Sequence, residues 1–244
     1  MKRVRIEDTG RGADVIIYPV PKGLRDPAAR SAAKQCTDTV RQRMNDRTAL
    51  QKFRRVLMCN FAPNDLVVGL TYRDDALPVT AEKAVKQGLK PFFKLLRQEL
   101  RTAGADELRY VYVTEGLHGE QRLHHHSVIP FMPGMQELVR RCWERNGDVI
   151  WFNRIADRGY DGWARYLSKE PRKTGRARVG QRMWTPSLGL KQPTVTVFDV
   201  ADDYEYELPP NAYVERNETY QTEWFTCRYI SWSQLSGSAE AAQN

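Results

Sequence analysis

All four histidines of the chain lie within nine residues, and three of them are consecutive. In the run from Leu123 to Ile129 (LHHHSVI), apolar and β-branched residues flank the histidines, which predicts a buried strand. Because alternate side chains of a strand point to opposite faces, His124 and His126 share one face and His125 lies on the other. Two imidazoles on one face can bind a single divalent metal ion. We therefore expect a metal site at His124 and His126.

A carboxylate is expected to complete this site. Residues 108–115 (LRYVYVTE) alternate as a strand, and the short turn that follows predicts an antiparallel hairpin with the histidine strand. Glu115 would then lie across from the histidines, with Glu120 in the turn as the alternative third ligand. Two imidazoles and one carboxylate leave coordination positions open for water or substrate. Such a mixed ligand set suits Mn²⁺ or Mg²⁺, with zinc as an alternative; packed structural histidines are the competing interpretation.

A tyrosine and a lysine follow forty residues after the histidine strand, in the segment from Tyr166 to Lys169 (YLSK). Their spacing of three places both on one face of a predicted helix. A phenol is a poor nucleophile at its usual pKa of about 10, so it needs a nearby cation, base or metal to stabilise the phenolate. Lys169 and a metal ion on the sheet could do this. The combination suggests DNA strand transfer with Tyr166 as the nucleophile.

The charge of the chain favours a polyanionic partner. The formal net charge is +8 and the pI is about 9.4, and lysine and arginine side chains bind phosphates by neutralising them. Basic residues are concentrated between 165 and 182, where Glu170 is the single acid. A solvated charged loop is the alternative interpretation. Together with Arg122 before the histidine strand, the residues expected to contact DNA are Arg165, Arg172, Lys173, Arg176, Arg178 and Arg182.

Other features of the sequence narrow the class of protein. The four cysteines are far apart and form no C-x-x-C pair, so neither a zinc ribbon nor a disulfide framework is indicated. No stretch of about 18 apolar residues is present, which predicts a cytoplasmic protein with no membrane partner. No P-loop pattern occurs, so we expect any helicase to be a separate protein.

The elements that must position these residues can be predicted from periodicity and from turn residues. Pro91 should kink or break the helix that contains it. In chain order, we expect a strand at 14–20, a basic helix from 27 to about 57, a strand at 65–72, a helix from 80 to about 104, strands at 108–115 and 123–129, a helix at 135–145, a strand at 149–155 and a helix at 160–170.

Hairpin-joined strands interleaved with helices indicate an α+β domain with a largely antiparallel sheet. After Pro193, three further strands are predicted at 194–200, 204–208 and 223–231, in an acidic segment that is a poor surface for DNA. The tryptophans Trp151 and Trp163 are expected in the core, although Trp151, Trp163 and Trp184 could stack on bases. The expected organisation is an N-terminal extension at 1–29, a catalytic domain with a basic helical arm at 30–195, a β-rich appendage at 196–232 and a disordered tail at 233–244.

These motifs resemble those of the HUH endonuclease superfamily. The run from Leu123 to Ile129 resembles its histidine-hydrophobe-histidine motif, the strand from Val67 to Tyr72 its first motif, and the segment from Tyr166 to Lys169 its tyrosine motif. The layout is similar to that of the rolling-circle replication-associated proteins of phages and plasmids. The resemblance covers roughly residues 30 to 195.

The resemblance implies a ferredoxin-like, five-stranded antiparallel sheet with helices, and a metal ion held by His124, His126 and an acid. It implies that Tyr166 attacks a phosphodiester of single-stranded DNA at a replication origin. The products would be a 5′-phosphotyrosine and a free 3′-OH that primes rolling-circle replication. A separate helicase and the polymerase of a bacterial host cell would be the partners.

The sequence departs from the superfamily pattern at two places. His125 occupies a middle position where a bulky apolar residue is usual, so a different ligand pair or an added polar contact is open. Tyr160 lies off the face of Tyr166, so a mechanism with two tyrosines is not expected. A relaxase or transposase with the same chemistry, a non-catalytic nucleic-acid-binding protein and a hydrolase that uses a zinc-bound water are the alternative functions.

Overall fold

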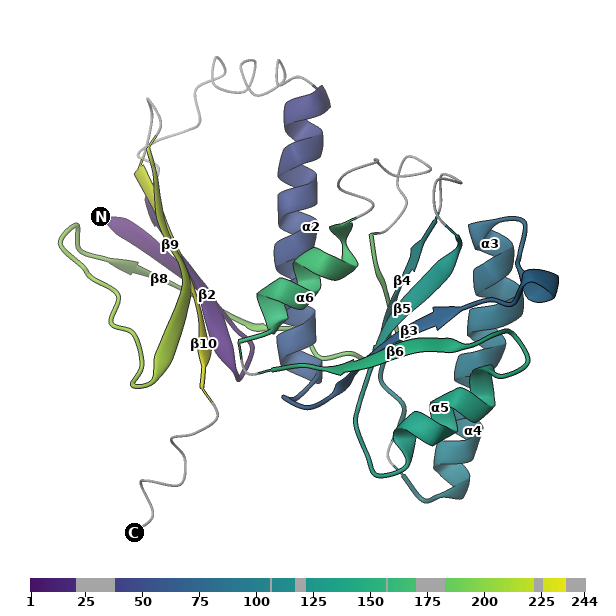
Figure 1. Ribbon diagram of the computed structural model, residues 1–244. Coiled ribbons are helices and arrows are strands. Elements are labelled where there is room, and N and C mark those ends of the chain that lie inside the picture. Colours follow the sequence, from purple (N-terminus) through teal and green to yellow (C-terminus); the bar gives the residue numbers. More distant parts are fainter. Residues whose placement is uncertain are drawn as a thin grey trace, which may run out of the picture. The chain divides into compact units, whose positions relative to one another are not determined.

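The computed structural model describes residues 1–20, 38–105, 107–116, 122–156, 158–169, 183–221 and 226–235. The chain divides into two compact units, each built around its own sheet (Figure 1). Unit 1 consists of residues 1–59 and 191–244, and unit 2 consists of residues 60–190. Unit 2 is therefore continuous in sequence and contains every residue proposed above for the metal site and the nucleophile.

The sheet of unit 2 has five antiparallel strands in the order β6-β3-β5-β4-β7, which confirms the predicted α+β class. Strand β3 is central, and its pattern of buried residues on both faces matches its apolar sequence LVVGLT. The predicted hairpin is formed by β4 and β5, with Glu115 directly opposite His124. The strands are β3 (Leu66–Thr71), β4 (Val111–Glu115), β5 (His124–Ile129), β6 (Val149–Arg154) and the short β7 (Thr185–Pro186).

Two amphipathic helices supply the main core on one face of this sheet. Helix α4 (Lys90–Thr102) buries Phe92, Phe93, Leu96 and Leu100, which recur at helical spacing. Helix α5 (Met135–Trp143) buries its own apolar side in the same way. These side chains form one cluster with alternate residues of β3. The opposite face of the sheet carries His124 and His126 and is approached by helix α6 (Tyr160–Leu167).

The helix before α4 is interrupted where proline predicted it. A short helix α3 (Ala81–Lys83) continues into a π-helical turn, η2 (Ala84–Leu89), and Pro91 is the second residue of α4. Proline has no N–H to donate and its ring crowds the preceding turn, and a π turn is wider than an α turn. The expected kink or break is therefore a widened turn, while the helical path continues. A single 3₁₀ turn, η1 (Asp74–Ala76), follows β3.

The sheet of unit 1 joins both ends of the described chain. Its strand order is β8-β1-β2-β10-β9, with all pairs antiparallel. Apolar side chains of β1, β2 and β10 form a core cluster. The strands are β1 (Lys2–Asp8), β2 (Gly12–Pro19), β8 (Thr194–Val200), β9 (Ala212–Gln221) and β10 (Thr226–Gln234).

This sheet corrects the expected domain organisation. The N-terminal hairpin is no separate extension, because β1 pairs with β8 along its length and β2 pairs with β10. The segment 204–208 lies in a loop, whereas β9 was not predicted. The expected disordered tail begins inside β10, and residues 236–244 lie outside the described part. Backbone pairing between the two ends of the chain thus replaces an extension and an appendage by one unit.

Helix α2 (Asp38–Asn60) belongs to unit 1 up to Cys59 and uses part of its basic surface internally. The Arg54 guanidinium lies 2.9 Å from Asp14 and 2.7 Å from Glu215, and Arg55 contacts Asp14 at 2.7 Å. Arg54 and Asp14 are almost fully buried, so these charges must be paired. This end of the expected basic arm is therefore held against the sheet of its own unit.

Candidate metal centre and tyrosine site

Strand β5 places its histidines on alternate faces, as its period predicts. His124 and His126 lie on the face toward Glu115, and their ring centroids are 4.9 Å apart. His125 lies on the core face, with its ring 5.5 Å from that of Tyr72 and 6.1 Å from that of Trp143. The three consecutive histidines thus belong to two different environments.

Glu115, His124 and His126 form a compact group that could hold a metal ion. One Glu115 carboxylate oxygen, Oε2, lies 3.3 Å from His124 Nε2 and 3.5 Å from His126 Nε2. The three ligand atoms lie within 4.8 Å of one another. Glu115 is fully buried, His126 is nearly so, and His124 is partly exposed at the open side. Glu120, the alternative ligand, lies outside the described residues.

A backbone contact orients His124 for such a role. Its Nδ1 lies 2.8 Å from the carbonyl oxygen of Arg122. A carbonyl only accepts, so Nδ1 carries the proton and the lone pair is on Nε2, which points toward Glu115. A hydrogen bond of this kind at the far ring nitrogen is the usual way in which proteins hold a metal-binding imidazole in place.

Buried polar atoms of this group lack hydrogen bonds within the described part of the chain. These atoms are both carboxylate oxygens of Glu115 and both ring nitrogens of His126. Buried polar groups are paired in the great majority of cases, and leaving one unpaired costs about 1–3 kcal/mol. A cation bound between them would satisfy the facing carboxylate oxygen and imidazole nitrogens together. The residues present therefore fit a divalent metal ion.

The pKa values agree with an ionised carboxylate beside neutral imidazoles. Burial alone would raise the pKa of Glu115, but His124, His126 and Lys169 outweigh it and lower the pKa to about 2. Burial lowers the pKa of His126, which Glu115 only partly opposes. A carboxylate and a neutral imidazole are the protonation states in which these side chains bind metals.

On the other face, His125 completes a closed hydrogen-bond network. Tyr72 donates its hydroxyl proton to the Ala84 carbonyl at 3.0 Å, so His125 Nε2, 2.7 Å from the Tyr72 oxygen, is the donor to it. His125 Nδ1 then accepts from the Thr114 hydroxyl at 2.9 Å. Burial, with His124 and His126 nearby, lowers the pKa of His125 to about 3. Of the two possibilities left open by the sequence, the histidine in the middle position makes an added polar contact.

Gly88 leaves room for this network. A Cβ atom at this position would lie 2.4 Å from the Tyr72 hydroxyl oxygen. The π-helical turn that contains Gly88 also supplies the Ala84 carbonyl. The irregular helix segment is thus fitted to the tyrosine that holds His125.

Helix α6 brings Tyr166 and Lys169 to the metal-binding face. The Tyr166 ring centroid lies 5.6 Å from that of His126, and Lys169 Nζ lies 4.0 Å from the Tyr166 ring centroid. The same ammonium is 3.5 Å from Glu115 Oε2. Tyr166 is 39% exposed and so accessible to a large substrate. The predicted nucleophile and cation therefore adjoin the predicted metal ligands.

Tyr160 has a structural environment. It is almost fully buried, and its hydroxyl donates to the carbonyl of Phe61 at 2.8 Å. A phenol held in this way is not available to an external phosphate. The contact agrees with the expectation that one tyrosine serves the site.

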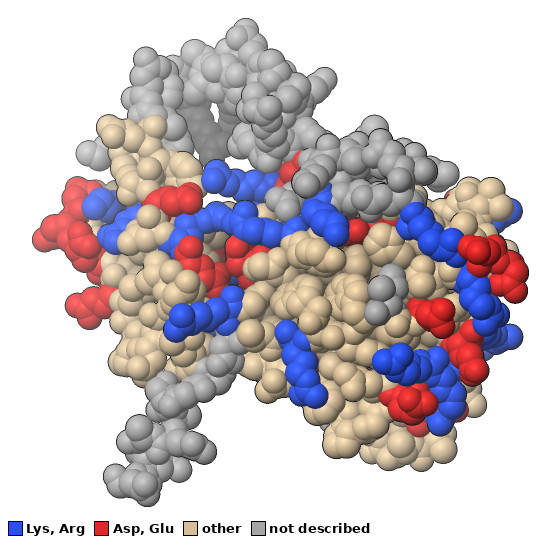
Figure 2. All heavy atoms as spheres, in the orientation of Figure 1, with Lys and Arg blue, Asp and Glu red and all other residues tan. Residues whose placement is uncertain are grey.

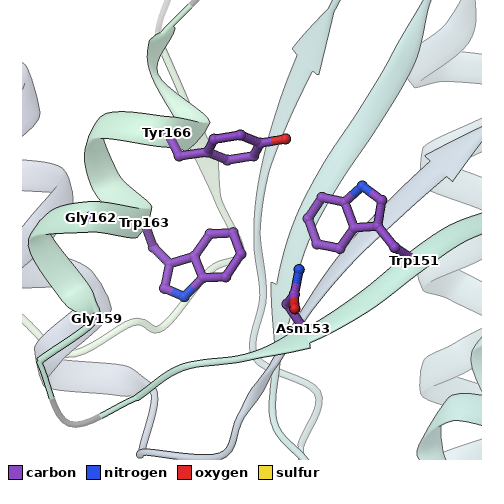
Figure 3. A pocket seen from close by; sticks show the side chains of 6 residues that line it. All are labelled: Trp151, Asn153, Gly159, Gly162, Trp163 and Tyr166. Atoms are coloured by element: carbon purple, nitrogen blue, oxygen red, sulfur yellow. The ribbon is translucent and has the colours of Figure 1, made fainter.

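Two tryptophans expected in the core instead line an open pocket of about 480 Å³ beside Tyr166. Trp151 comes from β6 and Trp163 from α6, and both are only partly buried. Figure 3 shows the two indoles facing each other below the tyrosine ring, with the Asn153 amide between them. The expectation of core packing was wrong because the sheet face opposite α4 and α5 is left partly open here.

Gly69 was the sequence signal for this arrangement. It lies in β3 directly between His126 of β5 and Trp151 of β6. A Cβ at this position would be 2.9 Å from the Trp151 indole, so only glycine lets the indole lie across the strand. The Trp151 and His126 rings consequently approach to 5.4 Å between centroids.

Only two of the seven basic residues expected to contact DNA can be placed. Arg122 contacts Asp74 at 2.6 Å and also donates to the Tyr72 carbonyl, and Arg165 contacts Asp161 at 2.5 Å. Both side chains remain more than 40% exposed. The remaining expected contacts lie outside the described residues: Arg172, Lys173, Arg176, Arg178 and Arg182.

Charge elsewhere is partly acidic. Figure 2 shows acidic side chains gathered at the left edge of unit 1, where Figure 1 places β8 and the loop after it. Asp202 and Glu205 from this segment are highly exposed. In the part of the chain that the structure describes, no helix combines the length and the apolar character needed to cross a membrane.

The matched segment of one family model includes the whole site just described. Residues 65–174 match the model of a family of replication-associated proteins, the ORF2 type. This segment begins just before β3 and contains Glu115, the histidines, Tyr166 and Lys169. The match supports a role for the chain as a replication initiator. It covers less than half of the chain and leaves unit 1 outside. No curated protein and no solved structure matches the chain.

Proposed function

We propose that the protein is a metal-dependent, tyrosine-dependent endonuclease and strand transferase of the HUH type that nicks single-stranded DNA at an origin and starts rolling-circle replication. The observation that carries this proposal is the convergence of Tyr166 and Lys169 on the buried Glu115, His124 and His126 group. The match of residues 65–174 to a replication-associated family supports the same role.

The proposed reaction follows from the chemistry of these groups. The Tyr166 oxygen loses its proton and attacks phosphorus, a bond forms between them, and the bond from phosphorus to the 3′ oxygen breaks. The 3′ oxygen leaves with the electron pair and takes up a proton, giving a 5′-phosphotyrosine and a 3′-OH. Lys169 stabilises the phenolate and the phosphate charge through its position over the tyrosine ring.

Glu115, His124 and His126 would hold Mn²⁺ or Mg²⁺. When bound, the ion supplies Lewis acidity, polarising the scissile phosphate and offsetting charge on its oxygens. Arg122, Arg165 and the basic residues at 172–182 would hold the DNA backbone. A separate helicase and the polymerase of a bacterial host would extend the 3′-OH in the cytoplasm.

The test of the nucleophile is adduct formation. Purified protein is incubated with labelled single-stranded oligonucleotides that include candidate origins and Mn²⁺, and denaturing gels are examined for a covalent adduct. Tyr166→Phe should abolish the adduct and spare DNA binding. Tyr213→Phe is a matched control, because Tyr213 is 38% exposed and lies in unit 1. An adduct that persists in Tyr166→Phe would refute the assignment.

The metal site has a test that does not depend on activity. Ligands that bind only the folded state raise its stability, by about 2.7 kcal/mol at a concentration of 100 Kd. Mn²⁺ should therefore raise the Tm of the wild-type protein and of His125→Phe but leave Glu115→Gln and His126→Ala unchanged. Equal shifts in all four proteins would place the ion elsewhere.

The alternatives predict other patterns. A relaxase or transposase would show the same adduct with a different DNA substrate. A hydrolase acting through zinc-bound water would keep its rate in Tyr166→Phe and lose it in His126→Ala. A non-catalytic binder would form no adduct and would be unaffected by a chelator.

A further inference from the structure

The pocket beside Tyr166 has features that the nicking chemistry does not require. Two indoles face each other across it, with ring centroids 6.0 Å apart and planes inclined by 24°. The Tyr166 ring borders both, at 5.7 Å from Trp163 and 6.4 Å from Trp151. Strand transfer needs the phenol oxygen, whereas flat aromatic surfaces in a row suit another flat group.

The polar group in the pocket is an amide. Asn153 is an exposed residue of β6, two positions after Trp151 on the same face of the strand. Its side chain points into the space between the indoles (Figure 3). An amide presents one acceptor and two donors side by side, which is the pattern that pairs with the edge of a nucleobase.

The backbone of the pocket keeps its mouth open on the helix side. Gly159 and Gly162 contribute to its lining at the start of α6. A Cβ at Gly162 would meet no atom within 4 Å, so the space in front of this residue is free in the structure. A planar group can therefore enter alongside Trp163.

We infer that this pocket binds an unpaired nucleobase of the nucleotide next to the scissile phosphate, with Trp151 and Trp163 stacking on the base and Asn153 reading its edge. The inference rests on the proposed function, because it takes single-stranded DNA as the substrate. Stacking of this kind tolerates every base, whereas the amide discriminates between them. Asn153 is thus a specificity-determining residue, and the two tryptophans position the strand so that its phosphate faces Tyr166.

The experiment separates base binding from phosphate binding. The full-length Tyr166→Phe protein, which keeps the aromatic ring, is titrated with single strands of about 12 nucleotides and with an abasic strand of equal length. Trp151→Ala and Trp163→Ala should each weaken binding of the base-containing strand at least about 5-fold and leave the abasic strand unchanged. Trp163→Phe should restore most of the loss, which excludes misfolding as its cause.

Phe131→Ala is the matched control, because Phe131 is an exposed aromatic residue of unit 2 that does not line the pocket and contacts Arg154. It should leave both affinities unchanged. Equal weakening of both strands by the tryptophan variants, or no weakening, would overturn the inference.

The role of Asn153 is tested with strands that differ at a single base. Asn153→Ala should bring the affinities for dA-, dC- and dT-containing strands closer together, with a smaller effect on their mean. Unchanged ratios would remove Asn153 from base reading. Adduct formation by the wild-type protein is measured in parallel. An adduct without base-dependent binding would refute this pocket alone, and base-dependent binding without an adduct would refute the nickase alone.

Discussion

The two faces of strand β5 carry the same residue type in opposite circumstances. On the core face, both ring nitrogens of His125 have hydrogen-bond partners, Tyr72 and Thr114. On the other face, both nitrogens of His126 are buried without one in the described chain, as are both carboxylate oxygens of Glu115. A satisfied polar group stabilises its own fold, whereas an unsatisfied one keeps its bonding capacity for a ligand. The hydrogen-bond inventory therefore separates the structural histidine from the functional pair.

The strongest test of this contrast compares activity after substitution on each face. His126→Ala should lower the rate of adduct formation by at least about 100-fold, because it removes a metal ligand. His125→Phe should keep a rate close to that of the wild-type protein, measured well below its Tm on denaturing gels. Similar losses in both variants would break the distinction between the faces.

The second test uses acid. The pKa of His125 is about 3 in the folded chain and near its ordinary 6.5 when unfolded, so the unfolded state takes up a proton first as pH falls. Stability that is present above pH 6.5 is therefore lost progressively toward pH 3. Urea unfolding at pH 7 and pH 5 should show the wild-type protein losing roughly 2 kcal/mol more than His125→Phe. Parallel losses would mean that His125 is protonated in the folded state.

A third test is the cost of removing the network at neutral pH. His125→Phe should lower the free energy of unfolding by roughly 1–2 kcal/mol, because the buried Thr114 hydroxyl loses its acceptor. In the double variant with Thr114→Val, this cost should be smaller than the sum of the two single effects. Additive costs in urea unfolding would show that the two side chains are not coupled.

The smallest expected effect is on the tyrosine side. Lys169→Gln should slow adduct formation about 5- to 10-fold, since one cation near the phenolate is lost while the metal ligands remain. Lys169→Arg should recover part of the rate because it keeps the charge. A rate unchanged in Lys169→Gln would limit the lysine to its contact with Glu115.

The sequence predicted the parts of the site that depend on local periodicity. The strand period alone separated His125 from its neighbours, and the hairpin placed Glu115 opposite His124. The partners of His125 were not predictable, because Tyr72 and Thr114 come from two other strands. The exposure of Trp151 and Trp163 was also missed, since it depends on how much of the sheet face α6 leaves open.

The second sheet shows the same limit on a larger scale. Strand β1 reads as a local hairpin with β2, but nothing in its composition specifies pairing with β8 nearly two hundred residues later. Strand β9 was missed because its sequence AYVERNETYQ is largely polar, as suits an exposed strand at the edge of a sheet. Non-local pairing is decided by the assembled fold and leaves little trace in the local pattern.

The division of unit 1 into two separate segments has a consequence for synthesis. Unit 2 is a continuous insertion, so the ribosome completes it before β8, β9 and β10 have been made. Strands β1 and β2 emerge early and must wait, with open edges, for partners translated much later. The nascent chain can therefore carry a folded unit 2 while its first hairpin is still exposed to aggregation or to chaperones.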